Sequence, residues 1–211
     1  KYWLMMIDEA TRFQWSYFIP TKKKTGDKIL SLLKHLKSQE NIDVKNIRCD
    51  DAGENVATKT LLDQEGYGIN FEFTSKGTPQ HNGIVERRFA TLYGRIRSML
   101  HGCGCPEKLK YKLWAECANT SGDLFNIQTH QADHKSPYEA FYGTLPPFAR
   151  KLRTFGQLGV VLNSSISQLK AKLKSRGVVR YFVGYAKNHA HDVYRMYNKH
   201  TGRASLTRDI R

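Results

Sequence analysis

The chain has 211 residues, which is enough for one large domain or for a domain with a small appendage. Apolar residues make up 40% of it and charged residues 25%, which is ordinary for a globular protein and excludes a largely disordered chain. No apolar run approaches the roughly 20 residues that span a bilayer. The four cysteines do not form a secreted disulfide framework, so a reducing compartment is expected.

Positive charge is concentrated at one end of the sequence. The formal net charge is +15, and residues 150–211 contribute +12 of it, whereas the first 149 residues carry only +3. A basic segment joined to a nearly neutral body predicts a polyanionic partner, most simply DNA or RNA. A basic surface that serves only solubility is the alternative.

The front of the chain predicts a hairpin followed by alternating helices and strands. Residues 1–8 and 13–19 are aromatic and β-branched runs separated by a polar turn. Apolar residues recur at helical spacing over 27–39. The remaining predicted elements are a strand over 44–50, a helix over 56–65 and a strand over 69–73. This order is typical of a mixed α/β sheet.

A long helix is predicted after the polar loop at 78–83, because its apolar side chains fall within one arc of about 100°. These residues are Val85, Phe89, Leu92, Ile96, Met99 and Leu100. A further helix is predicted around 109–118 and a linker at 143–147. Short strands at 155–162, 177–185, 193–197 and 203–207 predict a small basic β-barrel. We therefore expect two domains, 1–145 and 150–211.

Two carboxylates have the spacing and supports of a metal site. Asp50 closes a predicted strand, and Glu86 lies in the first turn of the long helix, with 35 residues between them. Mg²⁺ prefers carboxylate oxygens on rigid supports and keeps positions open for phosphate and water. A glutamate at a helix N-terminus is also favoured by the helix dipole without any catalytic role.

The same helix is predicted to carry an exposed basic flank. Arg87, Arg88 and Arg95 are expected to point into solvent, and Arg97 lies on the same line as Glu86. Basic side chains beside a carboxylate site would bring a phosphodiester to it.

Three sequence patterns together resemble a known family. They are Thr78-Pro-Gln-His-Asn-Gly-Ile-Val-Glu-Arg87, Arg48-Cys-Asp-Asp-Ala-Gly-Glu54 and Ile7-Asp-Glu-Ala-Thr-Arg-Phe-Gln-Trp15. They are similar to the integrase of copia-type LTR retrotransposons. Ser136-Pro-Tyr-Glu139, Phe155-Gly156 and Tyr181-Phe-Val-Gly-Tyr185 extend the resemblance over essentially the whole chain.

The resemblance implies a ribonuclease-H-like mixed sheet flanked by helices, and a triad of two Asp and one Glu that binds two Mg²⁺ ions, with Mn²⁺ as a substitute. By position, Asp50 matches the second acid and Glu86 the third. The implied reactions are processing of the 3′ ends of element cDNA and strand transfer into host DNA. The implied setting is a homo-oligomer made in the cytoplasm within a Pol polyprotein and acting in the nucleus, with no membrane and no small-molecule substrate.

Asp8 is the first aspartate in the chain, yet we do not assign it as the first acid. In the family, an acid in this hairpin turn recurs without binding metal, and the first Asp lies on the preceding strand. That strand would fall before Lys1, so the first strand of the sheet is expected to be missing and this segment alone is expected to be inactive or very weak. The alternative is a decayed or domesticated module that binds DNA or oligomerises without catalysis. A ribonuclease H or Holliday-junction nuclease on the same fold is disfavoured by the loop before Glu86 and by the basic tail.

Expected DNA contacts fall into three groups. The loop before the catalytic helix contributes Gln80, His81 and Asn82, and the helix itself contributes Arg87, Arg88, Arg95 and Arg97. The tail contributes Lys170, Lys172, Lys174 and Arg176, for which a solvated loop is an equal alternative. His101, Cys103 and Cys105 lack a second ligand pair at zinc-finger spacing, so no metal is expected there.

Overall fold

The structure is a computed structural model that describes residues 2–74, 83–129, 134–162, 177–187, 189–190, 192–208 and 210. The chain divides into two compact units. Unit 1 comprises Lys1–Ile7 and Trp15–Ala90, and unit 2 comprises Asp8–Gln14 and Thr91–Arg211. Each unit is described by itself below.

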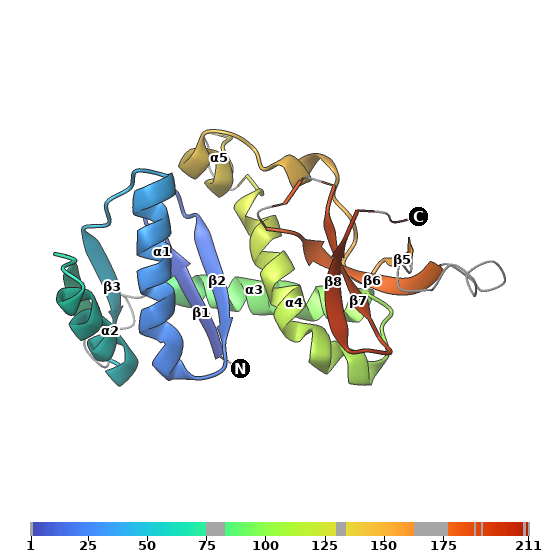
Figure 1. The fold of residues 1–211 in the computed structure, drawn as a ribbon, viewed down its shortest axis with the longest axis horizontal. Helices are drawn as coiled ribbons and strands as arrows, with labels where there is room; N and C mark the ends of the chain where they lie inside the picture. Colours follow the sequence, from blue (N-terminus) through green and yellow to red (C-terminus); the bar gives the residue numbers. More distant parts are fainter. Residues whose placement is uncertain are drawn as a thin grey trace, which may run out of the picture. The chain divides into compact units, whose positions relative to one another are not determined.

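Unit 1 contains two small sheets, each of two strands (Figure 1). Strands β1 (Tyr2–Ile7) and β2 (Gln14–Ile19) pair with one another, and β3 (Asn46–Asp50) pairs in parallel with β4 (Asn70–Thr74). The helices of the unit are the short 3-10 helix η1 (Lys22–Lys24), α1 (Thr25–Gln39), α2 (Gly53–Gln64) and the start of α3 (Gly83–Gly102).

Both sheets of unit 1 pack against one apolar core. Its buried residues are Ile29 and Leu33 of α1, Leu62 of α2, and Ile69. Partly buried side chains from three strands cover this cluster, namely Leu4, Met6, Ile47 and Phe71. Leu62 is fully buried. Burial of these side chains at about 1.5–3 kcal/mol each holds α1 and α2 on the strands.

Unit 2 is built around helix α4 (Glu107–Asn126) and a four-stranded antiparallel sheet. The sheet runs in the order β5 (Leu158–Leu162), β6 (Gly177–Tyr185), β7 (Tyr194–Asn198) and β8 (Arg203–Thr207). Its core consists of Val161, Phe182, Tyr185, Tyr194 and Met196. One further antiparallel bridge joins Val161 to Ile210, beyond β8.

Helix α4 is fastened to the sheet of unit 2 by polar contacts as well as packing. The Thr120 hydroxyl donates to the Val183 carbonyl at 2.7 Å, and both groups are buried. Arg195 of β7 donates from Nη2 to both Glu116 carboxylate oxygens at 2.7 Å. A satisfied buried hydrogen bond and a bidentate ion pair fix the position of α4 along the sheet and the side of the helix that faces it.

The predicted mixed α/β class is confirmed, and most predicted elements are present within a few residues. Three short helices were not predicted: the 3-10 helix η1, α5 (Pro137–Tyr142), and the 3-10 helix η3 (Pro147–Arg150), which begins at the last residue of the expected linker. The two compact units do not divide where the expected domains 1–145 and 150–211 do, because α4 groups with the C-terminal strands. That domain division, and full closure of the C-terminal sheet into a barrel, stay predictions.

Among the described residues, no helix is both long and apolar enough to cross a membrane.

Candidate metal and nucleic-acid site

Asp50 is the last residue of β3, and a neighbouring side chain orients it. Asn55, in the first turn of α2, donates from Nδ2 to Asp50 Oδ1 at 2.6 Å and to the Asp50 carbonyl at 3.1 Å. The parallel register sets Asp50 beside Thr74, the last residue of β4. An exposed carboxylate that is held at a strand end by one hydrogen bond keeps further oxygen lone pairs for another ligand.

Sequence reasoning missed Asn55. The signal was present in the six residues Asp50 to Asn55, where a glycine opens a helix and an amide follows in its first turn. Asn side chains near a helix start bond to nearby backbone and side-chain groups, so the amide can reach back to the end of the preceding strand.

Glu86 lies in the first turn of α3 and is exposed. The helix dipole favours a negative charge at this end. Leu92 and Ile96, of the predicted apolar stripe, are buried at 0% and 5% exposure. They anchor the helix that carries Glu86. Both candidate acids belong to unit 1.

Two of the arginines on α3 do not point into solvent as predicted. Arg88 is only 7% exposed. Its position is one turn before Leu92, so it lies within about 40° of a fully buried residue, and its aliphatic stem is covered with the apolar stripe. Arg95 is half-buried, its guanidinium donates to Gln128 Oε1 at 2.6 Å, and it lies over the Phe125 ring. Burial lowers the pKa of Arg95.

Arg87 is exposed, as predicted, and Arg97 is exposed as well. Arg97 donates from Nε to the Tyr93 carbonyl at 3.3 Å. This hydrogen bond holds the Nε end of the guanidinium close to the helix backbone. The predicted DNA contacts at 80–82 and at 170, 172, 174 and 176 lie outside the described residues.

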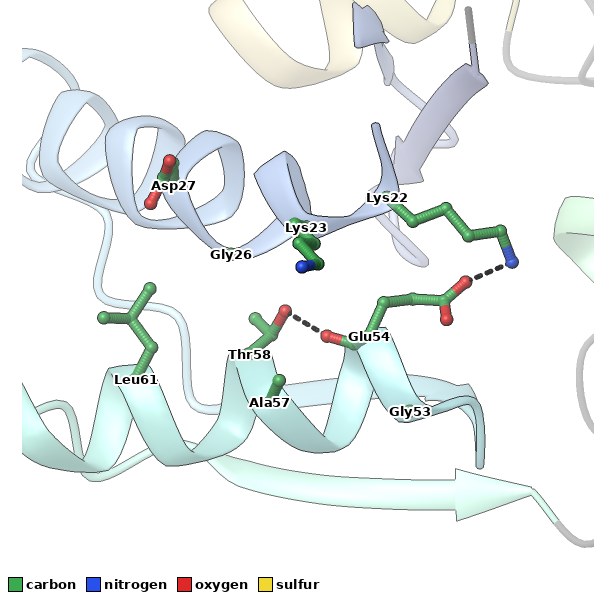
Figure 2. Close-up of a pocket in the computed structure, with 9 residues that line it drawn as sticks. All are labelled: Lys22, Lys23, Gly26, Asp27, Gly53, Glu54, Ala57, Thr58 and Leu61. Carbon is green, nitrogen blue, oxygen red and sulfur yellow. Dashed lines mark hydrogen bonds and ion pairs between the residues drawn. The ribbon is translucent and has the colours of Figure 1, made fainter. Parts of the chain in front are cut away.

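A cavity of about 320 Å³ lies between the starts of α1 and α2 (Figure 2). Among its lining residues, Lys22 donates from Nζ to Glu54 Oε1 at 2.6 Å (Figure 2). This hydrogen bond is the main reason why the pKa of Lys22 is raised and the pKa of Glu54 is lowered. The negative charge of Asp50 raises the pKa of Lys22 further. Because two cations, Lys22 and Lys23, and two anions, Asp27 and Glu54, line the cavity, its charges balance and it does not select an anion.

The residues present match a hard divalent cation in donor type but supply only part of a two-metal site. Carboxylate oxygens are the donors that Mg²⁺ prefers. Within the described ranges, no group of three or more His, Cys, Asp or Glu side chains is arranged to hold a metal ion. Asp50 and Glu86 are two such donors.

Asp8 has a structural partner in the turn between β1 and β2. Its Oδ2 accepts hydrogen bonds from the Thr11 amide at 2.8 Å and the Thr11 hydroxyl at 2.6 Å. The Asp8 amide in turn donates to the Phe13 carbonyl at 2.8 Å. These bonds stabilise the tight connection of the hairpin, where Arg12 adopts a positive φ of 64°. Asp8 belongs to unit 2, whereas Asp50 and Glu86 belong to unit 1.

The cysteines near the end of α3 are thiols in a packed environment. The Cys105 amide donates to Cys103 Sγ at 3.3 Å, and Cys105 is buried. Burial raises the pKa of Cys105 to about 12, with a further contribution from its bond to Cys103. A metal ligand must be a thiolate, so this environment opposes metal binding.

The chain is similar to polyproteins of plant retrotransposons. Over an alignment of 212 positions that covers 100% of the chain, it is 25% identical to the "Retrovirus-related Pol polyprotein from transposon RE1" of Arabidopsis thaliana. It is 32% identical over 126 residues, 60% of its length, to the corresponding polyprotein from transposon TNT 1-94 of Nicotiana tabacum. The chain is a homologue of plant retrotransposon Pol polyproteins. This agrees with the resemblance found in the sequence.

The relatives are much longer proteins than this Pol homologue. It spans 14% of the RE1 polyprotein and 9% of the TNT 1-94 polyprotein. A third relative, the RE2 polyprotein of Arabidopsis thaliana, is 24% identical over 74% of this chain, which spans 10% of that polyprotein. No family model matches the chain.

Solved structures with some similarity are retroviral integrases. The catalytic core domain of BIV integrase aligns with 65% of this chain and 82% of its own at 17% identity and a TM-score of 0.45. A simian T-cell lymphotropic virus intasome in complex with the PP2A regulatory subunit B56 gamma aligns with 95% of this chain and 67% of its own at 13% identity and a TM-score of 0.49.

The bond from Asn55 to Asp50 leads to a testable expectation. If Asp50 holds Mg²⁺, as the sequence predicts, Asn55→Ala in a protein extended upstream should raise the half-saturating Mg²⁺ concentration roughly 10- to 100-fold, the usual effect of losing a group that orients a metal ligand. DNA affinity should change little, because Asn55 carries no charge. The measurement is strand-transfer rate against Mg²⁺ concentration. Asn70→Ala is a matched control, since Asn70 Nδ2 donates to Asn46 Oδ1, an amide oxygen, instead of a carboxylate. Equal Mg²⁺ dependence of the two variants would contradict the role of Asn55.

Proposed function

We propose that this chain is a segment of a retrotransposon integrase, a polynucleotidyl transferase of the Asp-Asp-Glu type with a ribonuclease-H-like core. The observation that carries the proposal is the Asp50 carboxylate, held at the end of β3 by Asn55, with the exposed Glu86 in the first turn of α3 of the same compact unit. The similarity of the chain to a retrotransposon Pol polyprotein supports the same reading.

The proposed reaction is removal of nucleotides from the 3′ ends of element cDNA and transfer of those ends into target DNA. Mg²⁺, or Mn²⁺ in its place, would lower the pKa of the attacking water or 3′-hydroxyl and stabilise the leaving oxygen. Asp50 and Glu86 would hold the metal through carboxylate oxygens. Asn55 would keep Asp50 in one orientation, and Arg87 and Arg97 would contact phosphates near the site.

The substrate proposal rests on charge. The net charge of +15 favours a polyanion, and the +12 on residues 150–211 makes that segment a second contact region for DNA. Assembly as a homo-oligomer, production within a polyprotein and action in the nucleus follow from the same proposal, because joining two cDNA ends to a chromosome requires two active sites and nuclear DNA.

Catalysis by these 211 residues alone is proposed to be absent or very weak. Two carboxylates are too few to bridge a pair of metal ions and also to bind each ion from its outer side. The third carboxylate is therefore proposed to come from a strand upstream of Lys1. Loss of one acid removes a charge that a two-metal site needs.

A strand-transfer assay tests this function. The 211-residue chain and a version extended upstream would each be incubated with a duplex that mimics an element end, a target plasmid, and Mg²⁺ or Mn²⁺. Joined products are expected only from the extended protein. Robust transfer by the short chain would overturn the exclusion of Asp8. If the extended protein binds DNA but yields no product with either metal, the chain is the non-catalytic DNA-binding module instead.

A further inference from the structure

Helix α4 exposes an aromatic ring between two lysines. Tyr111 is 78% exposed, more than any other large hydrophobic side chain in the part of the chain that the structure describes. Lys108 and Lys112 are also exposed. We call these three residues the α4 surface.

The three side chains share one face of the helix. Positions 108, 111 and 112 fall within an arc of about 100° because helical neighbours are three and four residues apart. Leu109, Leu113 and Cys117 are buried and define the face that packs inside unit 2. The α4 surface is therefore the side of the helix turned away from its own core.

The acidic side chains of α4 form ion pairs with residues other than Lys108 and Lys112. Glu107 pairs with Lys110 at 2.7 Å, Glu116 with Arg195 at 2.7 Å, and Asp123 with Lys187 at 3.7 Å. Glu116 follows Lys112 by four residues, the spacing of a helical ion pair, yet its carboxylate accepts from Arg195. The charges of Lys108 and Lys112 thus remain as a local excess of positive charge around an exposed ring.

We propose that the α4 surface binds a single-stranded segment of nucleic acid, with the lysines on phosphates and the Tyr111 ring stacked on a base. This inference rests on the proposed function, because it adds a DNA contact to the same protein. Lys108 and Lys112 are separated by four residues, about 6 Å along the helix. That length is close to the axial span of about two nucleotides of one strand. An exposed aromatic side chain between cations matches a strand whose bases are unstacked, and a duplex would leave the ring without a base.

Binding of a fluorescent single-stranded oligonucleotide to the full 211-residue chain, measured over a series of salt concentrations, tests the proposal. Lys108→Gln with Lys112→Gln removes two phosphate contacts and should flatten the slope of log affinity against log salt by about 1.4, at roughly 0.7 per contact for a single strand. The affinity at 0.1 M salt should fall roughly 25-fold by the same relation. Tyr111→Ala should weaken binding roughly 5- to 150-fold with an unchanged slope, and Tyr111→Phe should retain most of the affinity.

A matched control removes the same charge elsewhere. Lys34→Gln with Lys37→Gln changes two exposed lysines of α1, which pair with Glu65 and Asp43 and so face acids. This variant should keep the wild-type slope. All variants carry surface substitutions, and circular dichroism with thermal unfolding checks that each one is folded.

The outcomes separate the two proposals. If the wild-type chain binds no nucleic acid, the proposed function fails. If it binds but the α4 variants match the α1 control, this inference alone is wrong. If Tyr111→Ala weakens binding to duplex DNA more than binding to single-stranded DNA, the stacking role of Tyr111 is overturned. If the α4 variants change the oligomeric mass measured by sedimentation and leave the salt slope unchanged, the α4 surface contacts another copy of the chain instead.

Discussion

Replacing Asp50 with Asn in the upstream-extended protein is expected to reduce Mg²⁺-dependent strand transfer by more than 100-fold while leaving DNA affinity within a few-fold. An amide offers one neutral oxygen where the carboxylate offers two charged ones, so it binds a hard cation poorly. Loss of a group that merely orients a metal ligand costs roughly 10- to 100-fold, and loss of the ligand itself should cost more. The hydrogen bond from Asn55 Nδ2 to position 50 can persist, because the new side chain keeps a carbonyl oxygen. The variant therefore tests charge at the site with little change of structure.

Glu86→Gln should also reduce Mg²⁺-dependent strand transfer by more than 100-fold. Asp8→Asn should leave strand transfer nearly unchanged. Asp8 accepts two hydrogen bonds from Thr11 in a hairpin turn, and Asn is accepted in such turns for the same geometric reason. The measurements are strand-transfer rate with Mg²⁺ and Mn²⁺, and DNA binding by fluorescence anisotropy in the absence of metal. Strand transfer that survives in Asp50→Asn but is lost in Asp8→Asn would reverse the assignment of the two acids.

The positions of the two acids were predictable because each depends on local sequence. The segment Val44–Cys49 begins with an apolar residue and reads as a strand, and Asp50 closes it. The apolar stripe through Leu92 and Ile96 specifies which side of α3 is buried. Asn55 was not predicted because a single amide in a helix start has many possible partners. Its partner becomes evident only when the turn from β3 to α2 brings it to 2.6 Å from Asp50.

The failure at Arg88 has a specific physical cause. A helical wheel sorts residues by polarity, and it assigned an arginine at the edge of the apolar arc to solvent. An arginine can bury its three-carbon stem beside apolar neighbours, so an edge position does not decide exposure. The 7% exposure of Arg88 shows that packing around α3 extends past the arc drawn from apolar residues alone.

The short helix α5 shows what local signals can and cannot do. Ser136 and Glu139 form a complete capping box, with the Ser136 hydroxyl accepting from the Glu139 amide at 3.2 Å and Glu139 Oε2 accepting from the Ser136 amide at 3.1 Å. The signature was readable in Ser136-Pro-Tyr-Glu139. Six residues are too few to show a helical period, so the capping signature alone does not predict a helix. Stacking of Phe13 on Phe141, at 5.1 Å between ring centroids, supplies tertiary support that no local pattern contains.

Gly156→Ala is expected to destabilise unit 2 by about 2–5 kcal/mol. Gly156 has a φ of 80°, where an L-residue with a side chain is strained by roughly 1–2 kcal/mol. A Cβ at this position would lie 2.4 Å from Cys103 Cβ and 3.2 Å from the Cys103 carbonyl oxygen, so the two backbones must separate. Such overpacking costs typically 1–3 kcal/mol more. The Gly156 amide also donates to the Phe182 carbonyl at 2.8 Å, and this bond resists any shift of the loop away from Cys103.

Comparison with a second glycine isolates the steric part of this loss. Gly104 has a φ of 61° but nothing within 4 Å of its ideal Cβ, so Gly104→Ala should cost only the backbone strain of roughly 1–2 kcal/mol. Chemical denaturation followed by tryptophan fluorescence and circular dichroism measures both losses. Because the obstructing atom is the Cβ of residue 103, Cys103→Ala should not relieve Gly156→Ala, whereas Cys103→Gly should recover part of the stability. Equal losses for Gly156→Ala and Gly104→Ala would show that the loop moves freely away from Cys103 and that the close approach places no constraint on the fold.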